Sequence, residues 1–339
     1  MVERRLVTIG ASAGGVQALV KLVHGLPSEL GATVLVAMHL SPDVPSHLAT
    51  VVGRATDMPT VFASDGMPLA AGTIVIAPPG AHMLLNDGTV SLSSGPKEHG
   101  ERPSIDPLFR SAAATYGRSV IGVLLSGSLD DGVAGLAKIV AEGGTAMVQS
   151  PEDAIHPSMP LQALRRVQVE ESLPADELGR AIGMRISEKE LAMSLHEDGP
   201  VGGPDEAAIE EMPKDASTGL TCPACGGAIW ELRNDGVTVL RCHVGHSYGL
   251  ESFAEAQSDE TEAALWEAIR ALEERRALLM RMADSADRSS RTLSAGQLRD
   301  AAADLDAKAD KVRRLVELLL APGGPLDAAA VRPIAVDAS

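Results

Sequence analysis

A serine between glycines, near the start of the chain, is the first feature that could do chemistry. Ser12 stands in a Gly-x-Ser-x-Gly pattern that follows the apolar run Leu6–Ile9 and precedes a helical pattern from Val16. In a strand–turn–helix context, the glycines allow a sharp turn that exposes the serine Oγ above a sheet. The helix also begins there, so its free N–H groups face whatever binds. The pattern therefore predicts a nucleophilic serine.

Two other interpretations of this turn stay open on the motif alone. Gly10, Gly14 and Gly15 could cradle a phosphate, although the full G-x-G-x-x-G pattern and a Walker lysine are both missing. The turn could also be a plain strand–helix connection that carries an incidental serine. A base and an acid at the same edge of the sheet would favour the nucleophile.

A histidine and two aspartates follow later expected strands. His39 comes directly after the apolar run Thr33–Met38, and Asp130 and Asp131 lie in a glycine-bearing turn after Val120–Leu125. Sites in parallel sheets lie at the carboxyl ends of the strands, so these side chains are expected near Ser12. A catalytic serine needs a histidine, and the histidine needs a carboxylate that fixes its tautomer. Spacing alone does not choose between the two aspartates, since either could be a helix N-cap.

The elements that must position these residues alternate between apolar runs and helical patterns. Near-continuous apolar strands separated by helices predict an α/β fold, with a mostly parallel sheet covered on both faces. The expected strands are Leu6–Ile9, Thr33–Met38, Thr73–Ala77, Val120–Leu125 and Thr145–Gln149.

A second group of residues with chemistry lies further along the chain. Cys222 and Cys225 form a Cys-x-x-Cys pair that precedes Cys242, and this spacing is typical of a Cys₃His zinc site. His243 and His246 both qualify as the fourth ligand. We favour His246, because its Cys-x-x-x-His spacing leaves the chain room to wrap the metal. A redox-active pair and metal-free thiols remain as alternatives.

The sequence around the cysteines predicts a zinc-ribbon-like unit, with a hairpin that turns at Asn234–Gly236. Leu298, Leu305, Val312 and Leu319 repeat every seven residues, which is typical of a helical hairpin or coiled coil. The expected parts are a catalytic domain at 1–187, an acidic flexible linker at 188–217, the zinc-ribbon-like unit at 218–250, the helical hairpin or coiled coil at 251–321 and a loose tail at 322–339.

Composition narrows the class of protein. The chain has 339 residues, enough for two domains, and its aromatic content of 2% requires an aliphatic core. A formal net charge of −17 argues against a general nucleic-acid binder, which needs basic surface. There is no long apolar run and no signal peptide pattern, and three cysteines do not suggest a disulfide framework. We expect a cytoplasmic protein without membrane insertion.

Several separated motifs, in one order, resemble the catalytic domain of the chemotaxis protein-glutamate methylesterases (the CheB type). The resemblance covers about residues 4–185. The stretches that carry it are Ile9–Gly15, Met38–His39, Ile76–Met83, Arg102–Asp106, Leu125–Gly132 and Met159–Pro160.

The resemblance implies a three-layer α/β/α fold and assigns roles to three residues. Ser12 corresponds to the nucleophile, His39 to the general base and Asp131 to the orienting acid. The family hydrolyses glutamyl methyl esters on chemoreceptors to glutamate and methanol, and some members deamidate receptor glutamines. Such acyl transfer needs no metal or organic cofactor. Its oxyanion needs backbone donors, for which we expect the N–H groups of Ala13 and Ser128.

The sequence also departs from the family pattern. Ala13 replaces a common threonine, and Ser128 and Leu129 replace the usual Met-Gly. Since the first expected strand begins near residue 6, we expect no receiver domain and no control by its phosphorylation within the chain. A non-catalytic regulator, which binds a partner through the ribbon and helices, is therefore the alternative function. The helices also offer a surface for self-association.

Overall fold

The computed structural model describes residues 5–193 and 218–321, with only the backbone described at 188–193. The chain divides into two compact units, one that ends at Phe253 and one that begins at Ala254. In the first unit, residues 218–253 are called the ribbon segment below.

Seven of the described strands form one parallel sheet with the order β3-β4-β2-β1-β7-β8-β9. Their bounds are β1 (Arg5–Ala11), β2 (Ala32–Met38), β3 (Thr60–Phe62), β4 (Ile74–Ile76), β7 (Val120–Leu124), β8 (Thr145–Gln149) and β9 (Glu171–Leu173). The central strand β1 pairs in parallel with both β2 and β7, so the carboxyl ends of these three strands meet at one edge. The predicted α/β fold with a mostly parallel sheet is confirmed.

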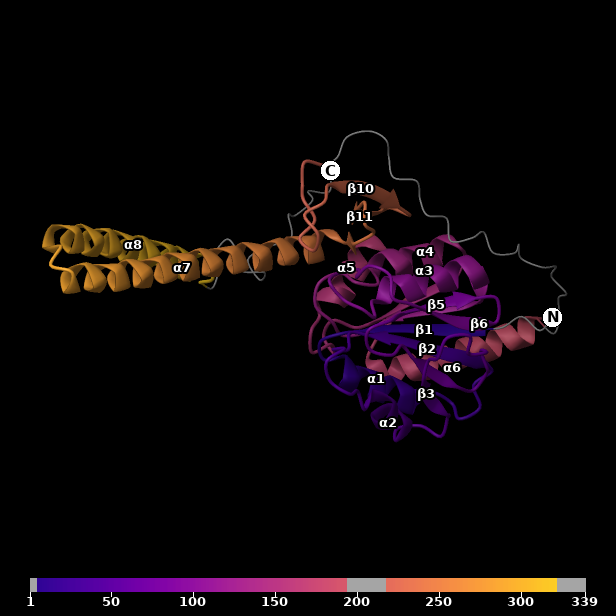
Figure 1. Ribbon diagram of the computed structural model, residues 1–339. Coiled ribbons are helices and arrows are strands. Elements are labelled where there is room, and N and C mark those ends of the chain that lie inside the picture. Colours follow the sequence, from indigo (N-terminus) through magenta and orange to yellow (C-terminus); the bar gives the residue numbers. More distant parts are fainter. Residues whose placement is uncertain (1–4, 194–217, 322–339) are drawn as a thin grey trace. The chain divides into compact units, whose positions relative to one another are not determined.

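Helices cover both faces of this sheet, as the three-layer prediction requires. Figure 1 shows α3 and α4 on one side of β1 and β2, with α1 and α2 on the other. The helices of the first unit are α1 (Gly15–Gly25), α2 (Leu48–Gly53), α3 (Ile105–Tyr116), α4 (Val133–Ala141), α5 (Ser158–Arg166) and α6 (Ala175–Met193), with a short 3₁₀ turn at Gly117–Ser119. The first two and α6 contribute to one buried cluster, and α3, α4 and α5 contribute to the other.

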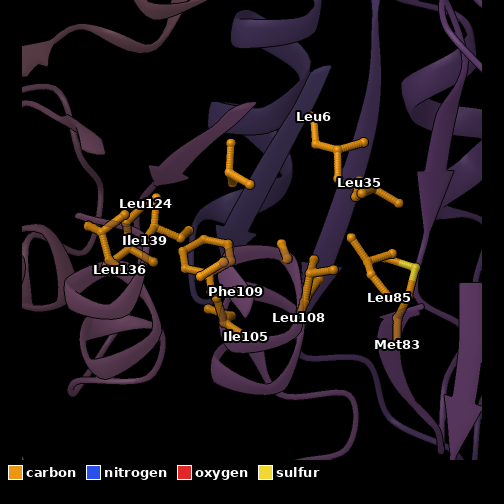
Figure 2. Close-up of a cluster of buried hydrophobic side chains, with 14 of the residues drawn as sticks. Leu6, Leu35, Met83, Leu85, Ile105, Leu108, Phe109, Leu124, Leu136 and Ile139 are labelled. Atoms are coloured by element: carbon orange, nitrogen blue, oxygen red, sulfur yellow. The ribbon is translucent and has the colours of Figure 1, made fainter. Parts of the chain in front are cut away.

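The core on the α3 side is almost entirely aliphatic, as the composition predicts. Figure 2 shows Ile105, Leu108 and Phe109 of α3 between side chains of β7 and α4 on one side and of β5 on the other. Phe109 is the largest side chain there and is fully buried. The same α3 residues that fill this core also place the start of α3 beside the edge where β1, β2 and β7 end.

Two small antiparallel sheets complete the first unit. The hairpin of β5 (His82–Asn86) and β6 (Thr89–Ser93) packs on the α3 side and was not expected from the sequence. The ribbon segment contains β10 (Ile229–Asn234), β11 (Val237–Cys242) and β12 (Ser247–Tyr248). Its hairpin turns at Asp235 and Gly236 with φ of 49° and 83°, the two positive values of a type I′ turn. This small antiparallel sheet agrees with the predicted ribbon.

The second unit is a pair of long helices. Helix α7 (Leu250–Arg288) begins in the ribbon segment, and α8 (Thr292–Leu319) follows after a short turn. The buried residues of α8 recur every seven positions and are Ala295, Ala302, Ala309 and Val316. The predicted leucine repeat lies beside this row and is only partly buried. Arg276 and Arg313 form ion pairs with Asp306 and Glu273 across the two helices.

The expected linker at 188–217 lies partly, and the expected tail at 322–339 wholly, outside the residues that the structure describes. Helix α6 runs to Met193, past the expected start of the linker at 188, while 194–217 and the expected tail at 322–339 lie outside the described residues. Among the residues described, no helix combines the length and the apolar character needed to cross a membrane.

Candidate active site and candidate metal centre

The turn after β1 holds Ser12 by backbone bonds. The Ser12 N–H donates to the Ser126 carbonyl at 3.0 Å, and the Gly15 N–H donates to the Ser12 carbonyl at 2.8 Å. Gly14 has φ of 69°, and a Cβ there would lie only 2.8 Å from the Ser126 Oγ. A glycine is therefore required at this position, both by the left-handed backbone and by the close approach of the neighbouring turn.

Three of the predicted residues form a hydrogen-bonded chain at this edge. The Ser12 Oγ lies 2.9 Å from the His39 Nδ1, and the His39 Nε2 lies 2.7 Å from the Asp131 Oδ2. Asp131 accepts, so Nε2 carries the hydrogen and Nδ1 is left to accept the serine proton. His39 follows β2 and keeps 18% of its side chain exposed, whereas Asp131 is buried with 2% exposed. The serine end of the chain thus faces the solvent side of the site.

The start of α3 holds the Asp131 carboxylate. The Ser104 hydroxyl donates at 2.9 Å to both carboxylate oxygens, and the N–H groups of Ile105 and Asp106 donate at 2.8 and 3.1 Å. Burial raises the pKa of Asp131, but His99, His39 and the Ile105 N–H together outweigh it and hold that pKa well below its usual range. The carboxylate therefore stays ionised and oriented toward His39.

The structure also distinguishes Asp130 from Asp131, which their positions in the sequence could not do. Asp130 turns away from His39 and accepts the N–H groups of Glu251 and Ser252 at 3.2 Å each. Arg166 lies 3.6 Å from the same carboxylate. Asp130 therefore faces the start of α7, while Asp131 faces the histidine next to the serine.

The expected oxyanion donors border the serine. No acceptor is recorded for the N–H groups of Ala13 and Ser128 within the described part of the chain. A Cβ added to Gly127 would lie 3.1 Å from the Ser12 Cβ, so the turn at 126–128 runs directly against the serine. The assignment of these two donors remains a prediction.

A buried histidine that the sequence analysis did not identify, His99, lies beside the Asp131 carboxylate. The His99 Nε2 lies 2.9 Å from the Asp106 Oδ2 and 3.7 Å from the Asp131 Oδ1, and its Nδ1 lies 3.6 Å from the Asp130 Oδ1. Burial lowers the pKa of His99, but the three aspartates outweigh it and raise that pKa well above its ordinary value. His99 follows no apolar run, so the pattern that identified His39 could not find it.

The ligand atoms of His99, Asp106 and Asp131 lie close enough together to hold a cation. Hydrogen bonds already engage them, however, because His99 donates to Asp106, and Asp106 also accepts the Gly135 N–H at 2.6 Å. A protonated His99 therefore supplies the positive charge that these buried carboxylates need.

The predicted cysteine cluster has the geometry of a tetrahedral metal site. The Cys225 Sγ lies 3.7 Å from the Cys242 Sγ, and the His246 Nδ1 lies 3.8 and 3.5 Å from the sulfurs of Cys222 and Cys242. Tetrahedral zinc, with bonds of about 2.3 Å to sulfur and 2.0 Å to nitrogen, separates its ligand atoms by about 3.5–3.8 Å. The cluster could therefore bind a metal. His243 lies outside it and faces the Trp230 ring at 5.9 Å.

A family model and individual relatives match this chain, and the descriptions of both name a methylesterase. A family model described as CheB methylesterase matches residues 7–182. The protein-glutamate methylesterase/protein-glutamine glutaminase 2 of Anaeromyxobacter dehalogenans is 38% identical over 177 residues, which cover 52% of this chain and 52% of that protein. The chain thus matches about half the length of this relative. The "Putative protein-glutamate methylesterase/protein-glutamine glutaminase" of Leptospira interrogans is 31% identical over 186 residues, which cover 55% of this chain and 96% of the relative.

A solved structure shows the same fold. The crystal structure of the Thermotoga maritima CheB methylesterase catalytic domain aligns with a TM-score of 0.52 and 27% identity, over 54% of this chain and all of that chain. The aligned share of this chain is close to the share that the family model matches.

Proposed function

Because the chain belongs to the CheB methylesterase family, we propose that it hydrolyses glutamyl methyl esters on chemoreceptors to glutamate and methanol. The observation that supports this most directly is the hydrogen-bonded chain from Ser12 through His39 to Asp131. Deamidation of receptor glutamines belongs to the same proposal, since the names of the relatives include a glutaminase activity. It replaces methanol by ammonia as the leaving group.

In the proposed reaction, the His39 Nδ1 takes the hydroxyl proton as the Ser12 Oγ attacks the ester carbonyl. The new C–O bond gives a tetrahedral oxyanion, which the N–H groups of Ala13 and Ser128 stabilise. His39 then returns the proton to the methoxy oxygen, the C–O bond to that oxygen breaks and methanol leaves. Water repeats the sequence against the acyl-enzyme and releases glutamate and free Ser12. Asp131 stabilises the imidazolium formed in each half.

The test is methanol release from a methylated chemoreceptor by the wild-type chain and by Ser12→Ala. We expect release by the wild type and its loss in the variant. Labelling by a fluorophosphonate, which reacts with an activated serine, is measured in parallel. Labelling without release would indicate a serine hydrolase with another substrate. A folded protein that neither labels nor releases methanol would instead support the non-catalytic regulator.

We propose that the cysteine cluster binds structural zinc through Cys222, Cys225, Cys242 and His246. The support is the match between the ligand separations and tetrahedral geometry. Zinc bound there would fix the ribbon segment and would supply no step of the hydrolysis, because the cluster uses other residues than the serine site. The cytoplasmic location expected from the sequence belongs to this proposal, since metal-binding thiols must stay reduced.

We also propose that α7 pairs with α7 of a second copy. A row of exposed small and apolar residues repeats along this helix, at Ala264, Ala268, Ala271, Leu278 and Met282. It borders a groove lined by Ala268, Ala271, Leu272, Glu274, Arg275 and Leu278. Because these positions have heptad spacing and lie outside the buried seam with α8, they suit a second coiled-coil contact.

The charges beside this row favour an antiparallel second copy. Placing Ala268 opposite Leu278 of the other copy sets Glu260 against Arg288 and Glu267 against Arg281. Sedimentation of the full chain tests this: Glu267→Arg and Arg281→Glu should each weaken the dimer, and the double variant should restore it. A wild-type monomer at micromolar concentration would contradict the pairing.

A further inference from the structure

The start of α7 reaches the residues that hold the catalytic acid. Asp130, next in sequence to Asp131, accepts the N–H groups of Glu251 and Ser252 in the first turn of α7. A Cβ at Gly249 would collide with the Asp130 carboxylate, so the chain can approach this closely only with glycine there. The contact therefore depends on the residue types at both positions, a carboxylate at Asp130 and a glycine at Gly249.

His99 joins this contact to the catalytic edge. Its Nδ1 lies 2.7 Å from the Ser252 Oγ, and its Nε2 lies 2.9 Å from Asp106 and 3.7 Å from Asp131. The Gly249 N–H lies 3.4 Å from Nδ1 and can donate to it only in the form of the ring that carries no proton on that nitrogen. The three surrounding carboxylates favour the form with both ring nitrogens protonated, in which Nδ1 donates to Ser252.

The backbone of His99 is held in the same way. It has φ of 53°, a left-handed value that is strained for a residue other than glycine and persists only where neighbours hold it. Its N–H donates at 2.7 Å to the carbonyl of Ser247, the residue that follows the cluster ligand His246. Residues of the ribbon segment therefore fix both the main chain and the ring of His99.

We propose that His99 is a positioning residue for Asp131, and that the ribbon segment, through Ser252, holds His99 in place and so completes the active site. His99 touches no substrate and acts through the carboxylate that orients His39. The proposal rests on the proposed function only in requiring that Ser12 is activated by His39 and Asp131. In this chain, a segment outside the family match at 7–182 thus contributes to the reactivity of the serine.

Charged groups surround His99 on every side that packs against it. Asp106 comes from α3, and Asp130 and Asp131 come from the turn before α4. Beyond them, Glu98 is paired with Arg110 at 2.7 Å, and Glu251 with Arg166 at 2.5 Å. Arg166 also lies 3.6 Å from the Asp130 carboxylate, so His99 is the cation nearest Asp106 and Asp131, and it shares Asp130 with Arg166.

The experiment compares Ser252→Ala with Ser258→Ala in the full chain. Ser258 is the matched control, because its hydroxyl donates to the Ala254 carbonyl of its own helix, at 3.1 Å. The rate of Ser12 phosphonylation by a fluorophosphonate is measured across pH, and ¹⁵N-histidine NMR follows the His99 ring, assigned with His99→Gln. We expect His99→Gln to slow Ser12 by ~10- to 100-fold, the cost of misplacing a catalytic group, and Ser252→Ala to slow it less.

The pH profile separates positioning from simple stability. Losing the Ser252 acceptor makes protonated His99 less stable, so Ser252→Ala should move the alkaline limb of the profile to lower pH and shift the Nδ1 resonance. Ser258→Ala should change neither. If folded Ser252→Ala and His99→Gln both react as the wild type does at every pH, His99 does not position Asp131. If the wild type itself does not react, it is the proposed function that fails.

Discussion

The parallel sheet and the ribbon segment hold their functional residues by different means. Ser12 and His39 follow strands whose residues are nearly all fully buried. Asp131 accepts hydrogen bonds from four donors, which are His39, the Ser104 hydroxyl and the first two N–H groups of α3. Of the four cluster residues, Cys242 ends β11, and the other three lie in the turns before β10 and between β11 and β12. One of these, Cys225, is exposed. A large core therefore fixes Ser12, His39 and Asp131, whereas the smaller ribbon segment would, on the proposal above, depend on a metal. The two regions should fail under different treatments.

The largest effect is expected from metal removal. Chelation or His246→Asn should unfold the β10–β11 hairpin, because structural zinc supplies about 10–16 kcal/mol in small zinc-dependent folds. Hydrogen exchange should show loss of protection in β10 and β11 while β1 and β7 stay protected. His243→Asn is the matched control and should retain one zinc per chain. If the amides of β10 and β11 stay protected from exchange without metal, the ribbon segment does not depend on a metal for its fold.

Asp131→Asn should have the next largest effect, through the catalytic edge alone. An asparagine cannot fix the His39 tautomer as the carboxylate does, and its NH₂ group would face donors from Ser104 and α3. The rate of methanol release should fall by ~10⁴-fold. Asp65→Asn is the control, since its carboxylate accepts one backbone N–H, from Leu92, far from His39 in the chain. Equal losses in both variants would indicate a general effect of charge.

Phe109→Ala should lower stability without touching the chemistry directly. Phe109 is fully buried on the α3 side of the sheet, and its Cβ lies so near Gly135 of α4 that no side chain fits there. Removing the ring should lower the free energy of unfolding by ~3–5 kcal/mol. Val44→Ala, at a position 63% exposed, should change it little. Urea unfolding followed by circular dichroism measures both, and equal midpoints would contradict the role of this core.

The sequence predicted the long buried strands and the residues that follow them. Near-continuous apolar runs predicted β1, β2, β4, β7 and β8, and with them Ser12 and His39 at the ends of β1 and β2. The edge strands β3 and β9 have three residues each, with partly exposed side chains. They are therefore too short to show a periodic pattern of apolar residues in the sequence. The choice of Asp131 came from the family resemblance, because both aspartates follow the same strand at almost the same distance.

His99 and the contact of α7 could not be predicted, because they depend on tertiary structure. The two partners of His99, Asp106 and Ser252, lie 7 and 153 positions away in the chain. Gly249 carried a weak signal, since a glycine before a long helix suggests a close approach, but nothing in the sequence identified Asp130 as the group approached. The charged state of a buried side chain depends on neighbouring groups, and here those neighbours come together only in the folded chain.

The smallest expected effect is a pH dependence of stability. The pKa of His99 is raised, so the native state binds a proton that the unfolded state has lost above about pH 6.5, the ordinary histidine value. This contribution is complete below that pH and is lost as pH rises through the raised pKa, at about 1.4 kcal/mol per pKa unit. The pKa values of Asp130 and Asp131 are lowered, so their contribution is present above about pH 4 and is lost as pH falls further.

The combined contribution of His99, Asp130 and Asp131 to the free energy of unfolding should therefore be highest between about pH 4 and 6.5 and should decline above that range. His99→Gln should flatten the decline on the alkaline side, because the group that loses its proton is gone. His24→Gln, an exposed histidine on α1, is the matched control and should leave the slope as it is. Urea unfolding of the three proteins at intervals of pH measures this. If the free energy of unfolding of His99→Gln still declines with rising pH as in the wild type, a group other than His99 loses the proton. The positive charge beside the buried carboxylates would then come from that group.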